Sequence, residues 1–178
     1  TCTGAKGTVC IVDVASGQIA ATIPVGHTPC APVLLPGGKR LFVCNQFNND
    51  VSVIDLEANK ETARVKAIRE PVGSAVTPNG GLVFVTNMLP VDPSDSYNVA
   101  AEVTVIDTGS LETSKIRLPN GSSSVREVCV SPDGAYAFVA HILSRYQMPT
   151  TQLERGWMNT NAMSVIDVAE KKLLNTVL

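Results

Sequence analysis

The chain has 178 residues, of which 44% are hydrophobic and 17% are charged, and its formal net charge is −2. This composition supplies a sizeable core and excludes a disordered chain. The small net charge gives no electrostatic basis for binding nucleic acid, and no apolar run reaches the roughly 18 residues of a membrane span. We therefore expect a folded chain that neither inserts into a membrane nor binds nucleic acid.

The predicted elements are short strands throughout. Val9–Asp13 is a β-branched run, and a turn signal at Ala15–Gly17 follows it. The stretch 51–87 then shows the pattern in full, with four strand-forming runs in which Pro78-Asn79-Gly80-Gly81 separates the last two. Asn and Gly accept the positive φ that a tight hairpin turn requires. Four antiparallel strands in about forty residues, repeated, are typical of a β-propeller blade.

Three landmarks recur in one order along the chain. The first is a strand that ends in aspartate: Val9–Asp13, Val51–Asp55, Val103–Asp107 and Met163–Asp167, with spacings of 42, 52 and 60 residues between the aspartates. The second is a turn: Pro36–Gly38, Pro78–Gly80 and Pro132–Gly134. The third is the strand after that turn: Phe42–Asn45, Phe84–Asn87 and Phe138–His141. The agreement of three landmarks indicates an internal repeat.

Two of these motifs resemble the YVTN family of β-propeller repeats. Phe84-Val85-Thr86-Asn87 nearly reproduces the tetrapeptide of the family's name, and Ser131-Pro132-Asp133-Gly134 matches its turn. The resemblance spans nearly the whole chain. It implies an all-β propeller of four-stranded antiparallel blades that serves as a scaffold or binding surface. Because family members include surface-layer-like and periplasmic proteins, it also implies a location outside the cytoplasm.

We name the strand positions of a blade A (before the Pro-x-Gly turn), B (the FVTN strand), C (the VSVID strand) and D. The predicted single propeller region, 1–178, then divides into a C–D half blade at 1–28 and blades at 29–68, 71–118 and 124–178. These fourteen strands form three and a half blades, or half of a seven-bladed ring. An open arc leaves apolar faces and an unpaired edge. We therefore expect part of a longer propeller or, alternatively, a homodimer of two arcs.

The loop between positions B and C grows along the chain, from 46–50 to 88–102 and then to 142–162. The B–C loops and the D–A links share one face of the repeat, and insertions gathered on one face indicate a binding face. The A–B and C–D turns on the other face are short, so we predict a structural role for them. We therefore expect the partner, a protein or a small ligand, on the B–C loop face.

The longest insertion concentrates aromatic, arginine and amide side chains of the kind that recognition surfaces use. They are Arg145, Tyr146, Gln152, Arg155, Trp157 and Asn159. An equally supported interpretation is that this loop packs on a neighbouring blade or caps the central channel. The segment is also similar to propeller regions of larger bacterial secreted proteins, some of which carry a c-type cytochrome domain.

Other candidates are more isolated. Arg126 begins an A strand near the axis and is the best single residue for binding an anionic group, although an ion pair with Glu127 or Glu154 is the ordinary explanation. His27 and His141 lie near the same face, and His141 replaces the Asn of the FVTN strand, so the same structural hydrogen bond is expected of it. A weak calcium candidate consists of Asp92, Asp95 and Asn98, but it lacks the Gly and Glu of an EF-hand loop.

The cysteines at 2, 10, 30, 44 and 129 form neither CxxC nor CxxCH, so the sequence predicts no metal ribbon, no attached haem and no cofactor. We expect small buried thiols, with a Cys2–Cys10 disulfide as the alternative. Three functions stay open at this point, and we favour the first. They are a non-catalytic binding module, an accessory propeller of a c-type-cytochrome-containing redox protein, and a propeller lactonase or dehydrogenase.

Overall fold

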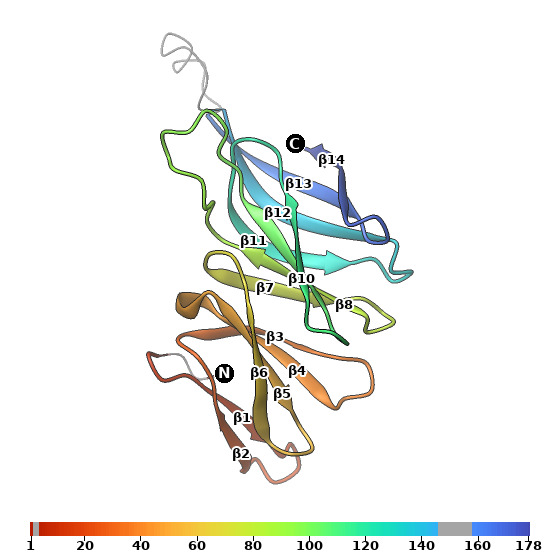
Figure 1. Ribbon diagram of the computed structural model, residues 1–178. Helices are drawn as coiled ribbons and strands as arrows, with labels where there is room; N and C mark the ends of the chain where they lie inside the picture. The colour runs from red at the N-terminus through yellow and green to blue at the C-terminus, as the bar shows by residue number, and fades with distance from the viewer. Residues whose placement is uncertain (2–3, 146–157) are drawn as a thin grey trace.

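The computed structural model describes residue 1, residues 4–145 and residues 158–178, and these residues form an all-β structure (Figure 1). The strands of the described part are β1 (Thr8–Val12), β2 (Ile19–Pro24), β3 (Pro29–Leu34), β4 (Arg40–Asn45), β5 (Asp50–Asp55), β6 (Lys60–Lys66), β7 (Pro71–Val76), β8 (Leu82–Asn87), β9 (Glu102–Asp107), β10 (Thr113–Arg117), β11 (Ser122–Val130), β12 (Tyr136–Ser144), β13 (Asn159–Asp167) and β14 (Lys172–Val177). A short 3-10 helix, η1 (Gln46–Asn48), follows β4.

The strands pair as the repeat predicts. The sheet β1–β2 comes first and is followed by three four-stranded antiparallel sheets, β3–β6, β7–β10 and β11–β14, each a meander in chain order. The landmark phenylalanines occupy one register, because the paired residues are Phe42 with Val53, Phe84 with Val105, and Phe138 with Val165. The predicted all-β architecture of four-stranded antiparallel sheets is therefore confirmed.

The core lies between the sheets. Figure 1 shows the four sheets one after another from the N-terminus to the C-terminus. Phe42 and Val43 point to opposite faces of their sheet, and both are completely buried. A strand with apolar residues on both faces is stable only where both faces are covered, which explains the continuous apolar runs. Strand β7 contacts β3 and β11, so the A strands lie side by side along the inner edge of the arc.

The C–D turns show the structural role of the repeated aspartates. Each aspartate side chain accepts a hydrogen bond from a backbone N–H two or three residues further on. The pairs are Asp13 with Ser16, Asp55 with Glu57, Asp107 with Gly109, and Asp167 with Glu170. This bond mimics a backbone turn and explains why an aspartate ends every C strand.

Both predicted bounds of the loop 142–162 are wrong. β12 and β13 continue beyond His141, with Ile142 paired with Asn161 and Ser144 paired with Asn159. Ile142, Leu143 and Thr160 favour strands, and pairing satisfies their backbone groups. The insertion therefore begins at Arg145, on the end of a two-stranded extension of the last sheet.

The cysteines agree only in part with the expectation of buried thiols. Cys44 is completely buried, and burial raises the pKa of its thiol well above the usual value. Cys129, in contrast, is exposed, which corrects the prediction for this residue. Cys2 lies outside the described residues, so the Cys2–Cys10 alternative stays a prediction. No helix in the described ranges is long and apolar enough to cross a bilayer.

Candidate functional site

The loop 88–101 is anchored to the D strand of its own blade. Asp92 accepts a 2.7 Å hydrogen bond from Arg117 on β10 and a 3.0 Å bond from the backbone N–H of Ala100. The Arg117 guanidinium and then the Ala100 N–H lower the pKa of the Asp92 carboxyl. Arg117 also donates to the backbone carbonyl of Asn98 at 3.5 Å. Two of the three calcium candidates thus converge on a guanidinium, and no cluster of three His, Cys, Asp or Glu suited to a metal occurs in the described chain.

A cavity of about 230 Å³ lies on the B–C loop face, between β11, β12 and β13. It brings together two residues that the sequence predicted separately, Arg126 and His141, and adds Ser124 and Asn161. Ser124 has a φ of 49°, a conformation that a non-glycine residue rarely adopts. This conformation coincides with the register shift between Ser123 and Glu127 in the pairing of β11 with β12. This cavity is our candidate binding site.

The backbone of Arg126 is hydrogen-bonded, whereas its side chain has no ion-pair partner among the described residues. Its carbonyl accepts a 3.4 Å hydrogen bond from the Thr86 hydroxyl of the preceding blade. The exposed guanidinium forms no ion pair with a described carboxylate. Glu127, the partner considered from the sequence, lies instead beside Gly73, where a Cβ would sit 3.1 Å from its carboxylate oxygen. The other candidate, Glu154, lies outside the described residues.

The side chains of four other arginines are engaged. They are Arg40 with the Thr108 carbonyl, Arg64 with Glu61, Arg69 with the Pro90 carbonyl, and Arg117 with Asp92. This contrast distinguishes Arg126 from the arginines that stabilise the blades. A guanidinium offers a fork of donors that matches a carboxylate or a phosphate, so an unoccupied one beside a cavity suits an anionic ligand.

His141 forms the structural hydrogen bond expected of it. Its Nε2 lies 2.8 Å from the Ser164 hydroxyl, and its Nδ1 lies 3.1 Å from the Ile142 carbonyl. The equivalent Asn45 and Asn87 donate to the C-strand residues Ser52 and Thr104. Because a carbonyl only accepts, Nδ1 carries the proton and Nε2 accepts from the hydroxyl. Burial lowers the pKa of His141, which keeps the ring neutral.

The cavity is therefore suited to binding rather than to acid–base chemistry. Both ring nitrogens of His141 are already engaged, so the ring is not positioned as a free general base. Ser124 is the only hydroxyl among the described lining residues, and it has no such base beside it. The groups that remain for a ligand are the guanidinium of Arg126 and the side chains of Ser124 and Asn161.

A second cavity of about 240 Å³ lies on the loop face, where the loop 88–101 meets the start of the last blade. Its lining is rich in serine: Ser94, Ser122, Ser123 and Ser144, with Val99 and Gly121. The loop is fixed here because the Val99 carbonyl accepts from the Gly121 N–H at 2.8 Å. The enlarged B–C loops thus do shape the surface around the candidate site.

The remaining predicted residues are dispersed. His27 lies in the link before β3, where its Nδ1 is 2.8 Å from the Thr28 hydroxyl and its ring packs edge-on against Phe47. It does not line the cavity of Arg126. Asn159 accepts from the Ser144 hydroxyl at 2.6 Å, and Arg145 is exposed beyond β12. The predicted binding residues Tyr146, Gln152, Arg155 and Trp157 lie outside the described residues.

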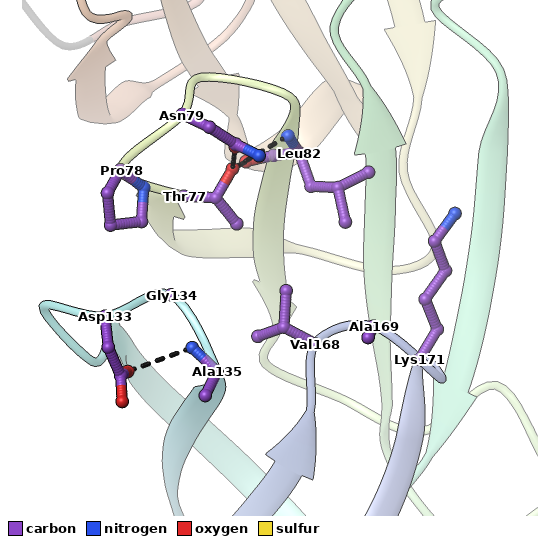
Figure 2. Close-up of a pocket in the computed structure, with 10 residues that line it drawn as sticks. All are labelled: Thr77, Pro78, Asn79, Leu82, Asp133, Gly134, Ala135, Val168, Ala169 and Lys171. Atoms are coloured by element: carbon purple, nitrogen blue, oxygen red, sulfur yellow. Dashed lines mark hydrogen bonds between the residues drawn. The ribbon is translucent and has the colours of Figure 1, made fainter.

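A cavity of about 390 Å³ lies on the turn face, where the sequence predicted only structural turns (Figure 2). It is formed by three turns, 77–82, 133–135 and 168–171. Its polar groups are mostly satisfied within those turns: the Leu82 N–H donates to Thr77, and the Ala135 N–H donates to Asp133. No single turn carries a signal for this cavity, because it arises only when adjacent blades meet.

Comparisons with known proteins define the class of this fold. No family model and no curated protein sequence matches the chain. Among solved structures, 735 chains match it. One is a chain of hydrazine synthase from Kuenenia stuttgartiensis, with a TM-score of 0.56 and 23% identity over 93% of this chain. The match covers 58% of that chain, so the present chain spans little more than half its length. At this identity the likeness establishes only the fold, that of a partial β-propeller.

Proposed function

We propose that this chain is a non-catalytic binding module of YVTN-type propeller repeats that works outside the cytoplasm. The location and the family rest on the resemblance of the FVTN and SPDG motifs. The ligand site is the cavity on the B–C loop face, and its ligand carries a carboxylate or a phosphate group. The observation that carries this proposal is the guanidinium of Arg126, which lines a cavity and has no described ion-pair partner.

The test is a titration of the isotope-labelled chain with acetate and with inorganic phosphate, followed by the amide signals of β11 and β12. Arg126→Gln should weaken binding by about 10-fold or more, because a charge-assisted hydrogen bond is worth roughly 1.5–3 kcal/mol. Lys172→Gln removes the same charge from the exposed strand β14 and should leave affinity within about twofold. Equal affinity of Arg126→Gln and the unmodified chain for both anions would contradict the proposal.

The long loop is tested separately. Arg145→Ala and Trp157→Ala should weaken binding of a protein partner without lowering the unfolding temperature, since Arg145 is exposed and follows the last residue of β12. Unchanged partner binding in both variants would show that the loop is not the recognition element. The Arg126 cavity would then carry recognition alone.

The second candidate is an accessory propeller of a redox protein that contains a c-type cytochrome. The observation in its favour is the fold likeness to a chain of hydrazine synthase, which extends over 93% of this chain. Because the five cysteines form no CxxCH motif, the haem would belong to a separate domain or protein. Titrating a purified c-type cytochrome with the chain tests this idea. A complex that shifts the haem absorption band supports it, and free cytochrome at saturating chain contradicts it.

A further inference from the structure

The turn-face cavity lies between the sheets β7–β10 and β11–β14, and the equivalent place between β3–β6 and β7–β10 is bridged by an arginine. Arg40 in β4 pairs with Asp55, and Leu82 in β8 pairs with Asp107, so Arg40 and Leu82 occupy the same repeat position. The Arg40 guanidinium crosses to the following blade and donates to the Thr108 carbonyl at 2.6 Å. Leu82 carries no donor, and it lines the cavity instead (Figure 2).

The residues on the receiving side of the two interfaces are equivalent as well. Thr108 and Val168 each follow a repeated aspartate, and both are buried. The N–H of each donates at 3.0 Å to the A–B turn of its own blade, from Thr108 to the Gly81 carbonyl and from Val168 to the Ala135 carbonyl. Val168 is thus the residue that an arginine at position 82 would approach.

The turns of the two interfaces also approach each other in the same way. A Cβ on Gly80 would lie 3.1 Å from Pro36 of the preceding blade, and a Cβ on Gly134 would lie 3.2 Å from Pro78. The backbones of the two interfaces therefore share one geometry. The missing guanidinium accounts for the space that is open in the second interface.

The cavity retains acceptors and apolar groups that suit a guanidinium on an alkyl stem. No described residue donates a hydrogen bond to the Val168 carbonyl, which is the equivalent of the acceptor that Arg40 uses. The lining also contains the carboxylate of Asp133, which can only accept. Leu82 and Pro78 supply apolar surface on the same lining. A guanidinium forms its strongest hydrogen bonds with such a carboxylate.

Lys171, the cation in the lining, is engaged elsewhere. Figure 2 shows Lys171 and Asp133 at opposite sides of the cavity. The pKa of Asp107 in the preceding blade is lowered first by its hydrogen bonds with Ser110 and Gly109, and also by the charge of Lys171. The ammonium group therefore acts on Asp107, and the Asp133 side of the cavity is left for a second cation.

We propose that the turn-face cavity binds an arginine side chain of a partner polypeptide, in the place that Arg40 occupies in the preceding interface. The alkyl stem lies on Leu82 and Val168, and the guanidinium donates to the Val168 carbonyl and to Asp133. The site takes a cation on the turn face, whereas the Arg126 cavity takes an anion on the B–C loop face. The two proposals can therefore fail separately.

The test is a titration of the isotope-labelled chain with N-acetyl-arginine amide, followed by the amide signals of the turns 77–82, 133–135 and 168–171. Saturable shifts are expected in these turns. N-acetyl-citrulline amide has nearly the same shape without the charge, and it should bind about 10-fold more weakly. Equal affinity for the two amides, or no saturable shift with the arginine amide, would overturn the proposal.

A variant that fills the cavity from within gives the sharpest control. Leu82→Arg places a guanidinium where Arg40 has one in the preceding interface, and it should abolish the shifts caused by the arginine amide. Leu174→Arg makes the same change at a position of β14 that is 55% exposed, and it should leave the affinity within about twofold. Unchanged binding by Leu82→Arg would refute the proposal.

If Leu82→Arg does not fold, Asp133→Asn provides the test. Asn79 holds the equivalent turn of the preceding blade by accepting from Thr77 and Gly81, as Asp133 accepts from Ser131 and Ala135, so the variant keeps its turn. Asp133→Asn should weaken binding of the arginine amide about threefold at low salt, and the difference should shrink at high salt. An affinity equal to that of the unmodified chain at low salt would contradict the proposal.

Discussion

The interior blades and the last blade place the same residues in different surroundings. Phe84 is completely buried between two sheets, whereas Phe138, at the same repeat position, is half-buried on an open face. Asn87 ends its B strand as the repeat requires, whereas His141 ends the equivalent strand and lies beside the Arg126 cavity. The repeat therefore determines the backbone conformation and the hydrogen bonds of each position, while the neighbouring blade determines how far the side chain is buried.

The largest contrast is expected from truncating the two phenylalanines. Phe84→Ala removes a fully buried ring and should lower the free energy of unfolding by about 3–5 kcal/mol. Phe138→Ala should cost roughly 1–2 kcal/mol, because less of its surface leaves water on folding. Urea unfolding of both variants measures the difference. Equal losses would mean that the last face is covered in solution.

The next contrast concerns the residue that ends each B strand. The Asn87 side chain accepts from the Ile68 N–H at 3.1 Å and donates to the Glu102 carbonyl and the Thr104 hydroxyl. Asn87→Ala leaves these buried groups unpaired and should cost about 2–3 kcal/mol. His141→Asn restores the repeat residue and should cost less than about 1 kcal/mol, since Asn donates to the same C-strand hydroxyl in both interior blades. Denaturant unfolding of the two variants measures both losses of unfolding free energy, and a loss for His141→Asn as large as that for Asn87→Ala would contradict the prediction.

The lowered pKa of His141 predicts an acid-dependent loss of stability in the last blade. As pH falls below the ordinary value of 6.5, the unfolded chain takes up a proton that the buried ring does not accept until lower pH. The free energy of unfolding should therefore fall with pH in this window. His141→Asn should remove that part of the slope. An identical pH profile in the two proteins would contradict the neutral ring inferred from its hydrogen bonds.

The smallest effect is expected at the anchor of the loop 88–101. Asp92→Asn weakens an ion pair with Arg117 at the surface and should change the free energy of unfolding by less than about 1 kcal/mol. The change should shrink further in high salt, which screens exposed charges. A large, salt-independent loss would show that the loop is part of the core of its blade.

The sequence predicted the features that depend on local chemistry. The aspartate turns and the register of the strands follow from residue types that recur at fixed positions, and the structure confirms them. The exposure of Cys129 did not follow, because burial of a strand residue depends on the sheet beside it. The extension of β12 and β13 was missed because the polar residues around Asn159 and Asn161 read as a loop.

The candidate site was predicted as separate residues and not as a cavity. Arg126 and His141 were identified singly, and only the pairing of β11 with β12 brings them together. Arg126 has no ion-pair partner in the described part of the chain because the Glu127 side chain turns toward Gly73, and sequence alone does not determine that direction. The turn-face cavity needs three turns from adjacent blades, so no single motif predicts it.

The most direct test of the difference between the blades is the reactivity of two thiols in the unmodified chain. Cys44 lies at a completely buried position of an interior blade, and Cys129 lies on the face of the last one. N-ethylmaleimide, followed by peptide mass analysis, should modify Cys129 rapidly and Cys44 only at the rate at which the blade unfolds. Protection of Cys129 equal to that of Cys44 would contradict the open face and the comparison built on it.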